Sequence, residues 1–171
     1  MILKLIEENE FELYYSLLEK DFCYEERRTK TDELKMLKNK RFKPYYIYDN
    51  NMLIGYFCYW DLGKFLFGEH FAVLENLRDQ GWGTKFLTFF LQNLKKPFVF
   101  EMEKPLDFQS KRRKYFYEQF DFVFNDFDYH QPSYHGDDKG IPMVFVSYPE
   151  KLTKARYSKM VKKIKKEVYK H

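Results

Sequence analysis

Residues Phe71–Thr88 read FAVLENLRDQGWGTKFLT and contain three features in a fixed order. An apolar strand comes first, then a turn that carries Arg78, and then an amphipathic helix from Thr84. The first turn of a helix has backbone N–H groups without partners and a partial positive charge. A phosphate or pyrophosphate satisfies both, and Gly81 and Gly83 let it approach the backbone. The stretch therefore predicts a phosphate-binding turn between a strand and a helix.

The rest of the chain predicts strands and helices in a mixed order. Alternating apolar residues indicate strands, and apolar residues three or four apart indicate helices. Hairpins come early and helical crossovers come late, which disfavours both a doubly wound sheet and a sandwich. Thr31 is expected to cap the second helix. The expected elements, in order, are strand Ile2–Ile6, helix Phe11–Glu19, helix Asp32–Lys38, strands Tyr45–Tyr48, Met52–Trp60 and Phe65–Leu74, helix Thr84–Asn93, strand Phe98–Met102, helix Gln109–Gln119, and strands Phe122–Phe127 and Met143–Tyr148.

The spacing of the turn distinguishes between phosphate-binding motifs. The P-loop pattern does not fit, and the dinucleotide fingerprint would need glycine at position 86, which is Phe. The pattern [QR]-x-x-G-x-[GA] fits from Arg78 to Gly83. Together with the strand end Phe71-Ala72-Val73, this turn resembles the pyrophosphate-binding turn of the GNAT N-acetyltransferase superfamily.

A second segment carries the same resemblance. Residues 115–122, YFYEQFDF, resemble the family's F-Y-E-x-x-G-F segment at the end of a helix. Asp121 replaces the usual glycine and is expected to adopt a left-handed backbone conformation. The element order is also that of the GNAT fold.

The resemblance implies an α+β fold, the GNAT acyl-CoA N-acyltransferase fold, with a mixed, mostly antiparallel sheet of about seven strands flanked by helices. It implies direct transfer of the acetyl group of acetyl-CoA to a primary amine. We expect a small-molecule acceptor, and a peptide or protein amine is the alternative within the same class. It also implies that coenzyme A contacts the strand end, the turn, the helix start and two positions in a later helix: Phe71, Ala72, Val73, Arg78, Asp79, Gln80, Gly81, Trp82, Gly83, Thr84, Ser110 and Tyr117. At the strand end, the backbone N–H of Phe71 or Val73 is the candidate donor to the oxyanion.

Three side chains are candidates for catalysis. By resemblance, Tyr117 is placed near the thioester sulfur, where a phenol can protonate the leaving thiolate. An amine must lose a proton before it attacks, and Glu69 or His70 could accept it. Adjacent strand residues face opposite ways, so only one of the two is expected to face the acceptor. Phe67 and Phe71 share a face with Glu69, so an apolar setting that raises its pKa is expected. A water chain without a dedicated base stays open.

Two polar segments are candidates for binding the acceptor. Glu25 and Glu26 lie where the family's variable first helices form the acceptor site, and they could hold a cation. Otherwise they are solvated charges. Residues 128–140 are expected to form a long loop, in which Gln131 and Tyr134 could cover the acceptor pocket. A mobile hairpin is the alternative for this loop.

Composition limits the class of protein. Aromatic residues make up 21% of the 171 residues, which argues against disorder. Cys23 and Cys58 are far apart and read as free thiols in a reducing compartment, with no metal site implied. No run of eighteen apolar residues and no signal peptide are found, so a cytoplasmic protein without membrane contact is expected. A homodimer stays open.

Charge is unevenly distributed. We divide the chain into an acetyltransferase domain, residues 1–149, and a basic helix or tail, residues 150–171. Residues 151–171 hold nine Lys or Arg and one acid, whereas residues 1–150 hold 21 basic and 25 acidic residues. A solvated helix that docks a narrow apolar stripe is the expected form. A non-catalytic module that binds CoA or nucleic acid is the alternative from another class. Nucleic acid is disfavoured as a partner because no recognition motif accompanies the charge.

Overall fold

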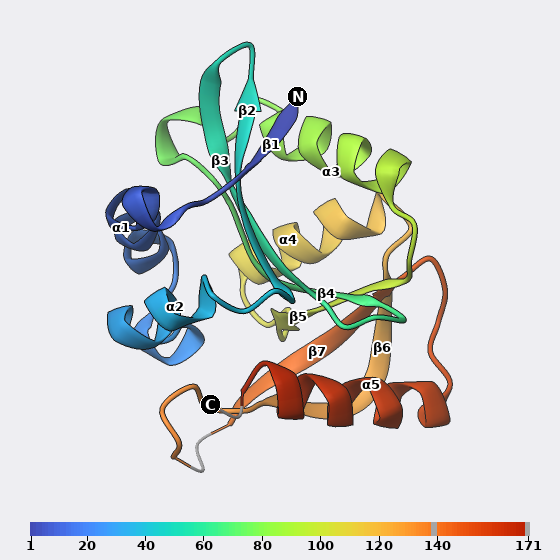
Figure 1. Ribbon diagram of the computed structural model, residues 1–171. Coiled ribbons are helices and arrows are strands. Elements are labelled where there is room, and N and C mark those ends of the chain that lie inside the picture. The colour runs from blue at the N-terminus through green and yellow to red at the C-terminus, as the bar shows by residue number, and fades with distance from the viewer. Residues whose placement is uncertain (138–139, 170–171) are drawn as a thin grey trace. The chain divides into compact units, whose positions relative to one another are not determined.

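The computed structural model describes residues 1–137 and 140–169, and its helices and strands follow the expected order (Figure 1). The strands are β1 (Ile2–Leu5), β2 (Phe42–Asp49), β3 (Met52–Asp61), β4 (Leu66–Val73), β5 (Phe98–Glu103), β6 (Val123–Gln131) and β7 (Ile141–Tyr148). The helices are α1 (Phe11–Asp21), α2 (Lys30–Met36), α3 (Trp82–Asn93), α4 (Phe108–Glu118) and α5 (Lys154–Glu167).

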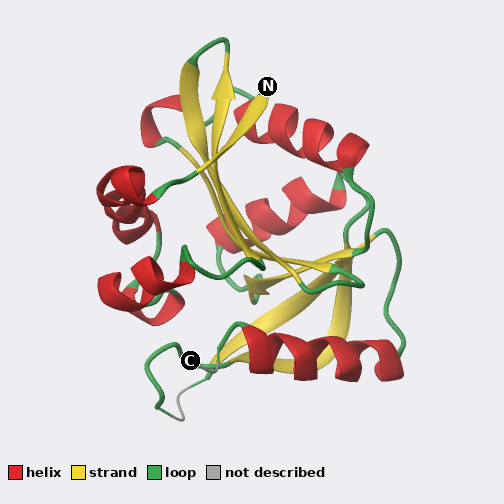
Figure 2. Ribbon diagram, in the orientation of Figure 1, coloured by secondary structure: helices red, strands yellow, loops and turns green. Residues whose placement is uncertain are grey.

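The strands form one seven-stranded sheet in the order β1-β2-β3-β4-β5-β7-β6 (Figure 2). Strand β2 pairs antiparallel with β1 and β3, and β7 pairs antiparallel with β5 and β6. The expected α+β fold with a mostly antiparallel sheet is therefore confirmed. The chain divides into two compact units, residues 1–61 with 68–95 and residues 62–67 with 96–171.

In the first unit, successive residues of β3 pack against helices that lie on opposite faces of the sheet. The Cys58 thiol lies 3.2 Å from the hydroxyl of Tyr14 on α1. The Phe57 ring packs against Phe86 and Phe90 of α3, with centroids 5.1 and 4.9 Å apart. The two-residue period of a strand thus separates the helices, because successive side chains point to opposite faces. Burial of each large apolar side chain contributes about 1.5–3 kcal/mol.

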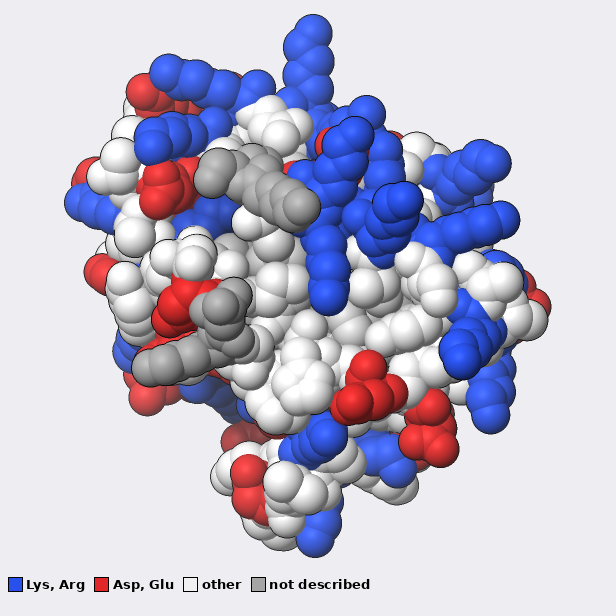
Figure 3. All heavy atoms as spheres, turned by 90° about the horizontal axis from the view of Figure 1, so that it is seen from below, with Lys and Arg blue, Asp and Glu red and all other residues white. Residues whose placement is uncertain are grey.

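In the second unit, helices α4 and α5 pack on strands β5 to β7. Tyr117 of α4 contacts Phe100 of β5 at a centroid distance of 4.6 Å. Tyr157 of α5 stacks on Phe127 of β6 at 4.0 Å, and the side chain of Ile164 is fully buried. Helix α5 therefore docks through an apolar stripe, while Lys and Arg side chains gather on its outer face (Figure 3). Lys170 and His171 of the expected tail lie outside the described residues.

Two local expectations were wrong. Helix α2 is capped by Thr29, whose hydroxyl accepts from the Asp32 N–H at 3.2 Å, and not by Thr31. Thr29 has the extended backbone that a capping residue requires, which starts the helix two residues early. Strand β6 continues to Gln131, opposite Ile141 of β7, so the start of the expected loop is a strand. Its polar residues alternate between buried and exposed positions, which disguised the strand.

Other backbone expectations are confirmed. Asp121 has a φ of 61°, in the left-handed region. Asn50 and Asn51 also have positive φ, which suits the tight hairpin turn between β2 and β3. Asp138 and Lys139 of the expected loop lie outside the described residues. Within residues 1–137 and 140–169, no helix combines the length and apolar character needed to cross a membrane.

Candidate functional site

Helix α3 begins directly after a turn with a left-handed residue. Gly81 precedes the helix with a φ of 80°, and a Cβ built on it would meet no atom within 4 Å. The first turn of α3 holds no acidic residue. Lys85, one turn into the helix, places its Nζ 4.2 Å from the centroid of the Trp82 ring. A helix start with open space beside it and a nearby cation suits an anion.

Arg78 ties neighbouring elements together, and its expected place near a bound pyrophosphate stays a prediction. Its Nε donates to the Val73 carbonyl at 3.0 Å, and its Nη2 pairs with Asp21 at the end of α1. Asp21 also accepts a hydrogen bond from Tyr56 at 3.0 Å. The guanidinium therefore ties the end of β4 to α1. Gln80 likewise holds the turn, through its amide and the Asn76 carbonyl at 2.9 Å.

The end of β4 lies unusually close to β3. A Cβ on Gly55 would lie 2.1 Å from the Ala72 carbonyl oxygen, so only glycine allows this approach. The Phe71 ring packs on Phe86 of α3, with centroids 4.8 Å apart. The backbone that carries the candidate donors, the N–H groups of Phe71 and Val73, is thus held by β3 on one side and by α3 on the other. A surface hollow of about 330 Å³ lies beside it and is lined by Leu17, Lys20, Asp21, Leu74, Glu75 and Asn76.

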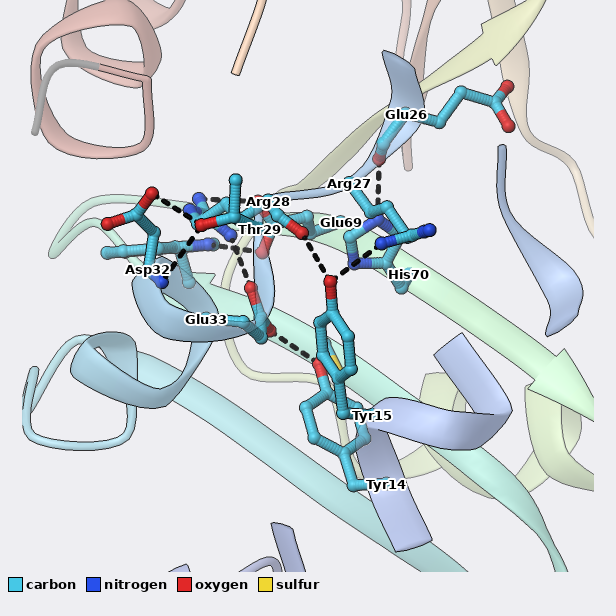
Figure 4. A network of polar contacts seen from close by, with 12 residues as sticks. Tyr14, Tyr15, Glu26, Arg27, Arg28, Thr29, Asp32, Glu33, Glu69 and His70 are labelled. Carbon is cyan, nitrogen blue, oxygen red and sulfur yellow. Dashed lines mark hydrogen bonds and ion pairs between the residues drawn. The ribbon is translucent and has the colours of Figure 1, made fainter. Parts of the chain in front are cut away.

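A buried ion cluster connects α2, β4 and the segment before α2 (Figure 4). Arg28 places Nη1 3.1 Å from Glu33 Oε2 and Nη2 2.8 Å from Glu69 Oε1. All three side chains are at most 3% exposed. Trp60 Nε1 donates to Glu69 Oε2 at 2.8 Å, so both carboxylate oxygens have a donor. One guanidinium thus lies between two buried carboxylates, those of Glu33 and Glu69.

The cluster extends into the core through Glu33. The Tyr14 hydroxyl donates to Glu33 Oε1 at 2.6 Å and lies 3.2 Å from the Cys58 sulfur. Because the phenol proton goes to the carboxylate, the thiol is the donor in the second contact. Burial raises the pKa of both Tyr14 and Cys58 well above their ordinary values, so both stay protonated.

The expectation of a raised pKa at Glu69 was wrong. Burial alone would raise it, but the Arg28 guanidinium, the neighbouring His70 and the hydrogen bonds from Arg28 and Trp60 together hold the pKa below 4.5. The Arg28 guanidinium belongs to a segment distant in sequence from Glu69. The alternation of side chains along a strand gives no information about such a partner. A carboxylate held this firmly as an anion is a poor proton acceptor.

This pairing predicts an acid-sensitive part of the stability. Because the pKa of Glu69 is lower in the folded chain, its stabilisation is present above 4.5 and is lost as the pH falls below that value. We expect the urea midpoint of Glu69→Gln to vary less than that of the unchanged chain between about pH 5 and pH 3. Equally steep losses in both proteins would contradict the assignment.

His70 differs from Glu69 in its partners. Its ring is 3% exposed, and Nε2 lies 2.9 Å from the Glu26 carbonyl oxygen. A carbonyl only accepts, so Nε2 carries a proton. Nδ1 is buried and has no hydrogen-bond partner among residues 1–137 and 140–169. In the neutral imidazole Nδ1 is then an acceptor with a free lone pair. Glu69 and His70 both contact the segment between α1 and α2, Glu69 through Arg28 and His70 through the Glu26 carbonyl.

The other expected site residues have local roles or stay untested. The Glu26 carboxylate accepts from the Cys23 N–H at 3.4 Å, which caps a short helix, whereas Glu25 is exposed. Ser110 is 1% exposed and shares a capping box with Asp107. Gln131 is buried in β6, and so does not lie in a covering loop.

Tyr117 and Tyr134 lie in the second unit. The Tyr117 hydroxyl has no hydrogen-bond partner among the described residues, and burial raises its pKa to about 12. The Tyr134 ring lies 4.8 Å from that of Tyr169, which follows α5. The sequence did not reveal Arg28 and Glu33 as members of a cluster. The one signal in the sequence was Glu33, a charged residue at an inward position of α2, because a buried carboxylate needs a partner.

Comparison with known proteins places the fold in context. No protein-family model matches the chain, and no curated protein matches it. Among solved structures, a protein from Bacteroides thetaiotaomicron assigned as a GNAT-family acetyltransferase is 29% identical, with a TM-score of 0.92, over 99% of this chain and 98% of that one.

More distant structures share the fold. The ribosomal-protein-S18-alanine N-acetyltransferase of Escherichia coli is 13% identical with a TM-score of 0.64, over 89% of this chain and 95% of that one. An aminoglycoside 6′-N-acetyltransferase solved with coenzyme A is 13% identical with a TM-score of 0.57, over 88% of this chain and 99% of that one.

Proposed function

Since this chain belongs to the GNAT superfamily, we propose that it is an acetyl-CoA-dependent N-acetyltransferase that acts on a primary amine of a small molecule. The observation that carries the proposal is the start of α3, where Gly81 is left-handed and a Cβ on it would meet no atom within 4 Å. The first-turn N–H groups, with Lys85, would hold the pyrophosphate. When bound, the thioester supplies an acetyl group activated for transfer to an amine.

The residues of β4 provide the chemistry around the acetyl group. The backbone N–H of Phe71 or Val73 would donate to the acetyl oxygen as negative charge develops on it. His70, with its unpartnered Nδ1, accepts the proton of the attacking amine. The electrostatic effect of His70 already lowers the pKa of Glu69, so the Glu69 carboxylate would stabilise the imidazolium that forms. In this arrangement Glu69 assists the base and is not the base itself.

Tyr117 has a more limited role than a full proton donor. With a pKa raised to about 12, its phenol stays protonated at neutral pH and can donate a hydrogen bond. A thiol has a pKa of about 8.5, so complete transfer from the phenol to a thiolate is uphill. We therefore assign Tyr117 a hydrogen bond to the leaving sulfur, with water as the final proton source.

The turn can be tested by substitution of its glycine. Gly81→Val places a branched side chain in the space proposed for the pyrophosphate, and CoA binding should weaken by well over tenfold. Gly63→Val is the matched control, because Gly63 also has positive φ, 84°, and open space around it. Both variants should lose a similar amount of stability, about 1–2 kcal/mol from backbone strain. Calorimetry that finds unchanged CoA affinity in folded Gly81→Val would rule out this site.

A further inference from the structure

The lysines of α5 gather on the side of the helix that faces solvent (Figure 3). At 3.6 residues per turn, five of them fall within an arc of about 140°. All five are exposed, and the short side chains of Ala155 and Ser158 are the other members of this arc in α5. We call the five the lysine face, and they are Lys154, Lys159, Lys162, Lys165 and Lys166.

The positive charge of the lysine face is not offset by nearby acids. At its border, Arg156 pairs with Glu150, and Lys163 pairs with Glu167. Among the residues that the structure describes, none of the five lysines of the face forms an ion pair. Residues 1–150, in contrast, hold 21 basic and 25 acidic residues. Five positive charges are thus concentrated on one helix of a chain that is otherwise mildly negative.

The apolar side of α5 is already occupied by the sheet. Ile164 is 0% exposed and Met160 is 8% exposed, and Tyr157 stacks on Phe127 of β6. A helix that binds a membrane surface inserts its apolar side chains among the lipids. Docked in this way, α5 has no large apolar side chain to insert, because the side that faces solvent presents lysines, Ala155 and Ser158. The lysine face therefore suits a partner that is bound through charge alone.

A nucleic acid matches the lysine face in length and in charge. At 1.5 Å per residue, the face extends about 18 Å from Lys154 to Lys166. A DNA duplex carries one negative charge per about 1.7 Å of its axis, so a duplex beside the face offers several phosphates. Lysine ammonium groups bind phosphates as point charges. Contacts with phosphates carry no sequence information, so they require no recognition motif.

We propose that the lysine face of α5 binds nucleic acid through the phosphate backbone, without sequence preference. Lysines that neutralise phosphates release the counterions condensed on the backbone, so the affinity falls steeply as the salt concentration rises. The lysine face belongs to the second unit alone, and this binding goes beyond the proposed transferase function and does not depend on it.

Replacement of three lysines tests the proposal. The unchanged chain should raise the fluorescence anisotropy of a labelled DNA duplex of about 20 base pairs and of a labelled RNA single strand of about 20 nucleotides, with affinities that fall between about 50 and 200 mM salt. Lys159→Gln/Lys162→Gln/Lys166→Gln should weaken binding of the duplex by at least about tenfold at 100 mM salt. The slope of log affinity against log salt should become shallower by about 2 to 3, close to one for each lysine removed.

A second triple variant is the matched control. Lys35→Gln/Lys38→Gln/Lys40→Gln removes the same charge from exposed lysines at the end of α2 and just after it. It should change the affinity and the salt slope little. If both triple variants weaken binding equally, net charge governs it and the lysine face is not the site. Unchanged affinity in the lysine-face variant would also overturn the proposal. The urea midpoint of each variant should equal that of the unchanged chain, because the replaced side chains are exposed.

Two further measurements identify the site and the class of partner. Saturating CoA should leave binding of the duplex unchanged, because the start of α3 is not part of the lysine face. Displacement of the duplex by CoA would place the nucleic acid at that turn and contradict the proposal. Vesicles of phosphatidylserine and phosphatidylcholine should leave the chain in the supernatant after sedimentation at about 150 mM salt, because no apolar side chain of the face can insert. A chain that sediments with these vesicles and binds neither nucleic acid would show that the partner is an anionic lipid surface, and the inference would be wrong.

Discussion

Replacement of His70 by Gln should lower kcat for acetyl transfer by about 10²–10⁴-fold, the usual effect of losing a general base. The amide nitrogen of Gln can still donate to the Glu26 carbonyl, which Nε2 of His70 contacts at 2.9 Å. The variant lacks the lone pair of Nδ1 and should otherwise resemble the unchanged chain. Its CoA affinity and its urea midpoint should therefore change little. The measurement is free thiol release with the amine that the unchanged chain acetylates fastest.

A pH series and a control make this result specific. The deficit should shrink at high pH, because more of the amine is then neutral without help from a base. His130→Gln changes an exposed histidine of β6 and should leave kcat unaltered at every pH. If His70→Gln retains more than half of kcat, His70 is not the base. A water chain would then be the remaining route for the proton.

Replacement of Arg28 by Met should destabilise the chain by about 3–5 kcal/mol, because it leaves buried carboxylates without their cation. Glu33 and Glu69 are 0% and 1% exposed, so water cannot easily replace the guanidinium. The variant's loss of stability should be measured by urea unfolding at neutral pH. Adding Glu69→Gln to Arg28→Met should recover part of the loss, since one buried charge is then removed.

An exposed arginine provides the comparison for Arg28. Arg113 is 51% exposed and pairs with Glu103, and pairs of this kind contribute about 0–1 kcal/mol. Arg113→Met should accordingly have a small effect. If Arg28→Met costs no more than Arg113→Met, the buried cluster does not stabilise the fold.

Local features of the fold could be predicted from the sequence. The turn before α3 depends on adjacent residues, and its glycines, arginine and helix start all lie within a few positions. The left-handed Asp121 and the hairpin at Asn50 and Asn51 likewise reflect the local preferences of Asp and Asn. The turn that resembles the GNAT family is also formed by adjacent residues. The fold could therefore be predicted from it.

Long-range electrostatics could not be predicted in the same way. Arg28 and Glu69 are 41 residues apart, and they meet only when the segment before α2 lies against β4 in the folded chain. The apolar neighbours of Glu69 along its strand therefore suggested the wrong direction for its pKa. Arg78 is a similar case, because its partner Asp21 lies 57 positions away. The coenzyme A contacts, the catalytic roles and the domain boundary between residues 149 and 150 stay predictions.

The most direct test of the transferase function is release of free thiol from acetyl-CoA in the presence of amines. The purified chain should release coenzyme A rapidly with at least one primary amine, and mass spectrometry should find that amine heavier by one acetyl group. With acetyl-CoA alone, thiol release should be slow, and no acetyl group should remain on the protein. An absence of amine-dependent thiol release across mono-, di- and polyamines, in a chain that binds CoA, would contradict the transferase function.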